Sequence, residues 1–192
     1  MKNVYIILTQ SGTLISKTLK LFTHDKYNHA SICVDDDFSK FYSFGRLKVN
    51  NPLIGGFVTE NAFTHVFGKF KKVPCMVLKI EVSDEKYQQI VEVIQEFTND
   101  PNKYKYDYYN LFLAKTPLMV GHMNRYFCSE FVAFVLESCG MKLPSKIEKM
   151  RPYWFTHLEG VEVLYQGELK EWCGSAYKTV LPVQKETVTI GT

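Results

Sequence analysis

The sequence lacks any apolar run long enough to cross a membrane, which takes roughly 18 consecutive apolar residues. It also lacks the apolar core of a secretory signal, because the run that follows Met1, Lys2 and Asn3 stops at Thr9. We therefore expect a protein of the cytoplasm.

Cysteines are few and scattered. The five cysteines are an odd number, and no two have the Cys-x-x-Cys spacing. This pattern argues against a disulfide framework and against a zinc site. Cys33 and His29, on one face of an expected strand, would offer a metal only two ligands. We predict no metal and no cofactor, and we expect free thiols, which persist in a reducing cytoplasm.

Long blocks of basic residues are also missing, and the net charge is only +3. These features argue against a nucleic-acid partner. The densest basic cluster, Lys69, Lys71 and Lys72, is typical of a solvated loop or strand edge. Contact with an anionic membrane is the alternative, with weaker support.

Apolar and aromatic residues are plentiful. Hydrophobic residues make up 46% of the 192 residues and aromatic residues 15%, which predicts a globular protein with a sizeable core. We expect a single domain over residues 1–175 and a loosely held C-terminal tail over residues 176–192. The sequence does not indicate an oligomeric state.

The hydrophobic pattern predicts a mixture of strands and helices. The segment 45–72, rich in Gly, Asn and aromatic residues, is expected to be a long surface segment with one helical turn near 60–63. Asp107 is expected to cap a short helix that carries Leu111 and Phe112. The expected strands are 4–8, 27–34, 41–44, 73–82 and 161–165, and the expected helices are 11–22, 84–99, 128–139 and a short one over 144–150.

The stretch 126–136 is the most informative in the sequence. Its apolar body predicts a helix that begins at Cys128 and ends before Gly140. A thiol at a helix start lies near unpaired N–H groups and the positive end of the helix dipole, and both favour the reactive thiolate. The alternative is a buried structural cysteine, since free cysteine is among the most buried residue types.

A nucleophilic thiol needs a base within hydrogen-bond reach. Of the five histidines, His29 alone stands at the start of an expected strand, where it could face a helix packed on the sheet. Alone, such a histidine is more often a core or surface residue, so the hypothesis depends on the pair His29 and Cys128.

Three segments carry a family resemblance: Tyr-Asn-His-Ala-Ser-Ile-Cys-Val at 27–34, Tyr-Asp-Tyr-Tyr-Asn-Leu at 106–111, and Tyr-Phe-Cys-Ser-Glu-Phe-Val at 126–132. In this order the sequence resembles the circularly permuted branch of the NlpC-type papain-like cysteine hydrolases, which includes the YiiX-like bacterial proteins and the lecithin:retinol acyltransferase group. The resemblance implies an α+β fold, with a small antiparallel sheet or partial barrel packed against helices and the catalytic cysteine at a helix N-terminus. It implies Cys128 as the nucleophile and His29 as the general base.

The third catalytic residue is the point at which the sequence departs from the family pattern. The position that orients the imidazole falls near Ser43, and a serine hydroxyl orients a ring only weakly. The alternatives are a backbone carbonyl or an acid from elsewhere, such as Glu60. Substrate contacts are predicted at four further residues, which are Tyr27 (as a donor to the oxyanion), Tyr42, Ser129 and Tyr108.

Two functions from different classes remain open. The first is a cysteine hydrolase or acyltransferase that acts on an amide or ester of a small peptide or acyl substrate through a thioester. The second is a catalytically inactive binding protein on the same fold, which the serine at position 43 favours.

Overall fold

A computed structural model describes residues 1–10, 26–48, 51–108 and 123–180. The helix expected over 11–22, the capped helix carrying Leu111 and Phe112, and the end of the expected tail, 181–192, lie outside the described residues. Within them, no helix is long and apolar enough to cross a membrane.

The fold is α+β and is built on an antiparallel six-stranded sheet with strand order β4-β3-β2-β1-β5-β8. Its strands are β1 (Lys2–Thr9), β2 (His29–Cys33), β3 (Phe41–Lys48), β4 (Asn51–Glu60), β5 (Pro74–Val82) and β8 (Val161–Glu168). The helices are α2 (His65–Gly68), α3 (Asp84–Asn99), α5 (Cys128–Ser138) and α6 (Leu169–Val180), with 3-10 turns at Pro101–Lys103, Ile147–Lys149 and Pro152–His157. Two short parallel strands, β6 (Lys105–Tyr106) and β7 (Arg125–Tyr126), form a separate pair.

The apolar run at the N-terminus forms β1, a central strand that pairs with β2 on one side and with β5 on the other. Alternate side chains of β1 enter two different cores: Val4, Ile6 and Leu8 enter one, and Tyr5 and Ile7 enter the other. A strand buried on both faces explains why its sequence is continuously apolar instead of alternating.

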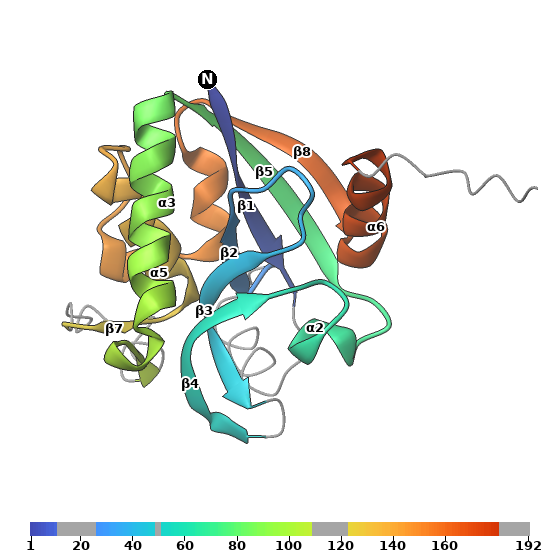
Figure 1. Ribbon diagram of the computed structural model, residues 1–192, viewed down its shortest axis with the longest axis horizontal. Coiled ribbons are helices and arrows are strands. Elements are labelled where there is room, and N and C mark those ends of the chain that lie inside the picture. The colour runs from blue at the N-terminus through green and yellow to red at the C-terminus, as the bar shows by residue number, and fades with distance from the viewer. Residues whose placement is uncertain (11–25, 49–50, 109–122, 181–192) are drawn as a thin grey trace, which may run out of the picture.

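Helices cover both faces of the sheet (Figure 1). Helices α3 and α5 pack on one face over the larger core, which contains the ring of Phe97. On the other face, Phe67 of α2 and Cys173 of α6 belong to the smaller core. The helix expected after Ser83 is confirmed, and the Ser83 hydroxyl accepts a hydrogen bond from the backbone N–H of Lys86 at 3.3 Å.

The expectation for residues 45–72 was wrong in its first half. Instead of a surface segment, β3 and β4 form a long hairpin in which Gly45 pairs with Gly56. The glycines that suggested a loop permit close packing: a Cβ added to Gly55 would lie 2.9 Å from the Cβ of Tyr106. The helical turn was expected near 60–63, but Glu60 ends β4 and the helical turn, α2, lies further along at His65–Gly68.

The C-terminal boundary also differs from expectation. Helix α6 runs through the expected domain end at residue 175, and it reaches Val180. Its buried residues Leu169 and Cys173 anchor it to the smaller core. The part of the expected tail from 176 to 180 is therefore helical.

Candidate active site

Cys128 is the first residue of α5, as the sequence predicts. Phe127 precedes the helix, and its backbone N–H donates to Glu130 Oε2 at 3.1 Å. This bond satisfies one of the amides that a helix start leaves without a partner. The thiol is mostly covered, with 6% of Cys128 exposed, and it packs against Phe127 and Tyr106.

His29 is the first residue of β2, and its ring is paired with a carboxylate. Nε2 of His29 lies 3.0 Å from both Oε1 and Oε2 of Glu60, the last residue of β4. Ser31, two residues along β2, donates its hydroxyl to Glu60 Oε2 at 2.7 Å. The side chains of His29 and Glu60 are only 13% and 12% exposed, so the interaction is little weakened by solvent.

The side chain of Cys128 also acts on this imidazole, since it contributes with Glu60 to raising the pKa of His29. Because Nε2 faces Glu60, Nδ1 is the ring nitrogen that remains for another partner. Burial lowers the pKa of His29, but Glu60 and Cys128 outweigh it, so the pKa lies well above its ordinary value. The arrangement therefore favours an imidazolium between a carboxylate and a sulfur.

The orienting residue is Glu60 and not Ser43. Ser43 is buried, and its hydroxyl donates to the backbone carbonyl of Ala30 at 2.7 Å. It stabilises the pairing of β2 with β3 and does not supply the contact expected with the imidazole. The hairpin register places Glu60 opposite Phe41, and this brings its carboxylate to the start of β2.

Two of the residues predicted to contact substrate, Tyr27 and Ser129, have hydroxyls that hydrogen-bond the backbone. The Tyr27 hydroxyl donates to the carbonyl of Cys75 at 3.4 Å, and Tyr27 is 1% exposed. The Ser129 hydroxyl donates to the carbonyl of Met150 at 2.7 Å and is also buried. Both hydroxyls hydrogen-bond backbone carbonyls, so Tyr27 does not act as the oxyanion donor in this arrangement.

The other two predicted contacts are aromatic rings on different parts of the site. Tyr42 stacks on Phe57, with centroids 6.3 Å apart and planes 12° apart. Tyr108 lies 4.7 Å from Tyr106 by ring centroids, and Tyr106 packs on Cys128. Tyr108 is thus near the thiol through one intervening ring.

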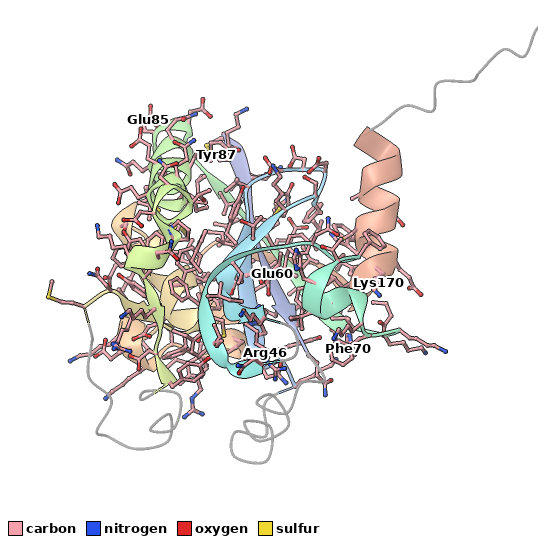
Figure 2. The ribbon with its side chains drawn as sticks, turned by 60° about the horizontal axis from the view of Figure 1, so that its bottom comes forward. Arg46, Glu60, Phe70, Glu85, Tyr87 and Lys170 are labelled. Carbon is pink, nitrogen blue, oxygen red and sulfur yellow. The ribbon has the colours of Figure 1, made fainter. Side chains whose placement is uncertain are left out.

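A cleft of about 230 Å³ opens beside Glu60. Arg46 from β3 also lines it, and the sequence analysis did not single out this residue. Figure 2 shows Arg46 and Glu60 in the same region of the molecule. The cleft is completed by residues of β3, β4, α2 and the segment that joins β4 to α2, which are Leu47, Phe57, Val58, Thr59, Asn61, Thr64, His65, Val66 and Phe67.

Comparison with known proteins shows a likeness of fold. No family model matches the sequence, and no curated protein matches it. Among solved structures, the chain is similar to the crystal structure of the metalloprotein YiiX from Escherichia coli O157:H7, with a TM-score of 0.55 and 16% sequence identity. The match covers 86% of this chain and 97% of YiiX.

The residues of this site do not match the donor set of a metal centre. Among residues 1–10, 26–48, 51–108 and 123–180, no group of three or more His, Cys, Asp and Glu side chains is placed to hold an ion. Both oxygens of Glu60 face His29, and one of them also accepts from Ser31. These side chains are therefore assigned no role as metal ligands.

Glu130 gives a prediction about stability against pH. Burial, with smaller contributions from Asp107 and Glu148, raises the pKa of Glu130 to about 8, although the bond from Phe127 lowers it. The folded protein therefore binds a proton that the unfolded chain releases near pH 4.5, and stability is lost as the pH rises towards about 8.

In Glu130→Gln this loss is absent, because an amide accepts the Phe127 N–H without ionising. Urea unfolding measures the free energy of unfolding of both proteins. The value for the variant minus that for wild type is expected to rise by about 3 kcal/mol between mildly acidic and mildly alkaline pH. A constant difference between the two proteins over this range would contradict the assignment.

Proposed function

We propose that the protein is a cysteine-dependent hydrolase or acyltransferase that acts on an amide or ester of a small peptide or acyl substrate. The observation that carries the proposal is the position of the His29 imidazole, which is hydrogen-bonded to Glu60 and is close enough to Cys128 for that side chain to act on its pKa. A thiol at a helix start, a base and a group that orients the base are the parts that thiol catalysis requires. The YiiX-like fold is compatible with this chemistry and does not by itself assign it.

The chemistry follows from the three side chains. His29 takes the thiol proton, and the Cys128 sulfur attacks the carbonyl carbon, whose oxygen becomes negatively charged. The backbone N–H of Cys128, in the first turn of α5, is suited to stabilise that oxygen. When the bond to the leaving group breaks, the His29 imidazolium gives its proton to the departing nitrogen or oxygen, and a thioester remains.

In the second half of the reaction, the thioester is broken down and the proton transfers run in the opposite direction. Water, in a hydrolase, or an acceptor alcohol or amine, in a transferase, attacks the thioester carbonyl while His29 takes its proton. The carbon–sulfur bond then breaks, and Cys128 recovers a proton from His29. Glu60 holds Nε2, which fixes the ring and leaves Nδ1 for the proton transfers.

The inactive binding protein remains the second candidate, because Cys128 is largely buried and a covered thiol reacts slowly. Its main sequence argument was the serine at position 43, and Glu60 now supplies the stronger orienting group. All five cysteines are free and buried, which suits a reducing compartment such as the cytoplasm.

Thiol labelling separates the two candidates. With limiting iodoacetamide at neutral pH, followed by mass spectrometry of the peptides, Cys128 is expected to be alkylated at least about tenfold faster than the other four cysteines. Burial raises the pKa of Cys33, Cys75, Cys139 and Cys173, so these serve as internal controls. Labelling of Cys128 at the same rate as these controls would support the inactive binding protein.

A further inference from the structure

Arg46 has a buried nitrogen with no hydrogen-bond partner. Its Nη2 is covered, and among the described residues no atom accepts a hydrogen bond from it. A covered guanidinium nitrogen without an acceptor is costly, and in a native protein such a group calls for an explanation. The residue paired with Arg46 on β4 is Gly55, which offers no side chain to meet the charge.

The negative group nearest in the cleft does not neutralise Arg46. Glu60 lines the same cleft, but its two oxygens are engaged by His29 and Ser31. Among the described residues, Arg46 forms no ion pair with Glu60 or with any other carboxylate. The cleft therefore holds a positive charge whose counter-charge is not supplied by the described residues.

Arg46 is also close to the tyrosine rings beside Cys128. Its positive charge acts on Tyr106 and on Tyr108, lowering the pKa of both against the larger effect of burial, which raises it. Tyr106 packs against the cluster that Phe127 and Cys128 form. Arg46 thus lies between the cleft beside Glu60 and the aromatic residues that cover the sulfur.

We propose that Arg46 binds a free carboxylate of the substrate, so that the protein acts on small amides or esters that carry an acid group near the scissile bond. This inference rests on the proposed function and names its substrate class. A planar guanidinium matches a carboxylate through two parallel hydrogen bonds. One carboxylate that reaches the guanidinium from the cleft supplies the single negative charge that balances Arg46.

The size and lining of the cleft favour this ligand over others. A volume of about 230 Å³, with Thr59, Asn61 and Thr64 in its wall, suits a short polar group better than a long acyl chain. A phosphate dianion would bring a second negative charge close to Glu60, and Arg46 is the one arginine or lysine among the described residues that line the cleft.

Protection of Cys128 from iodoacetamide tests the inference. The competitors are glutarate, its uncharged analogue glutaramide, and inorganic phosphate. At twice its Kd, glutarate is expected to slow the alkylation of Cys128 about threefold, whereas glutaramide has no effect and phosphate protects less. Within each variant the comparison is between rates with and without competitor, so a change in thiol reactivity itself cancels.

The variants identify the residue. Arg46→Met is expected to abolish protection by glutarate, Arg46→Lys to keep part of it, and Lys48→Met, which removes an exposed charge on the same strand, to keep all of it. Protection that survives in Arg46→Met, equal protection by glutaramide, or better protection by phosphate would each overturn the assignment.

A second measurement does not depend on the thiol. In Cys128→Ser, the side-chain Nε–H resonance of Arg46, assigned with Arg46→Lys, is expected to shift on titration with glutarate and not with glutaramide. If Cys128 proves unreactive, the proposed function fails while this titration still reports on the anion site. If Cys128 is selectively reactive but the resonance does not move, only the carboxylate site is refuted.

Discussion

Replacing His29 by alanine is expected to slow the alkylation of Cys128 at neutral pH about tenfold, and to lower any hydrolytic activity by a factor of about 100 or more. Without the imidazole, the thiol loses the neighbouring base that would accept its proton. Hydrolysis falls further than alkylation because the leaving group also loses its proton donor. The measurements are the alkylation rate by mass spectrometry and turnover of a panel of small esters and amides.

The control is His157→Ala, which removes an exposed histidine whose Nδ1 lies 3.2 Å from the hydroxyl of Thr156. It is expected to leave both rates unchanged. The effect of His29→Ala on alkylation should shrink above about pH 9, where an unassisted thiol ionises by itself. Equal rates for wild type and His29→Ala at neutral pH would show that the imidazole does not activate the sulfur.

Replacing Glu60 by glutamine is expected to change the pH dependence of activity, because Glu60 influences the pKa of His29. Because the charge of Glu60 raises that pKa, Glu60→Gln lowers it, and His29 then loses its proton at a lower pH. The alkaline limb of the pH–activity profile, which requires the imidazolium as proton donor, is therefore expected to move to lower pH. A shift to higher pH would contradict the geometry.

Phe97→Ala is expected to reduce the free energy of unfolding by about 4 kcal/mol, a large part of the roughly 5–15 kcal/mol that holds a domain folded. Phe97 projects from α3 and is 1% exposed. Its ring stacks on Tyr104 with centroids 4.0 Å apart and meets Phe131 of α5 nearly edge-on at 5.0 Å. Truncation leaves a cavity that this network of rings cannot close easily.

Urea unfolding measures the effect, and two variants frame it. Phe97→Leu keeps most of the buried volume and is expected to lose less than half as much. Phe63→Ala removes a ring that is 54% exposed and is expected to change stability by no more than about 0.5 kcal/mol. A loss from Phe97→Ala no larger than that from Phe63→Ala would mean that the ring is not part of the core.

The sequence was most informative where one local signal decides the structure. Ser83 followed by an apolar stripe predicts α3, and the apolar body after Cys128 predicts α5 with its correct first residue. The antiparallel α+β architecture was expected from the family resemblance. The particular order of the strands does not follow from local signals, because pairing depends on contacts between residues far apart in the sequence.

The hairpin was missed because its signals were ambiguous. Gly55 and Gly56 suggest a loop when no neighbour is known, and only the approach of Tyr106 and Tyr108 explains Gly55 as a residue of a strand. The choice between Ser43 and Glu60 has the same origin. Both lie on the hairpin, and the hydrogen bond of Ser43 to Ala30 is visible only once β2 and β3 are paired.

The long separation between His29 and Cys128 in the sequence has a consequence for biosynthesis. The ribosome releases the strand that carries the imidazole, and the hairpin that ends at Glu60, well before α5 emerges. During that interval the basic side chain has its carboxylate but no sulfur. Under the proposed function, a nascent polypeptide therefore carries an incomplete centre, which is completed only when the helix docks on the finished sheet.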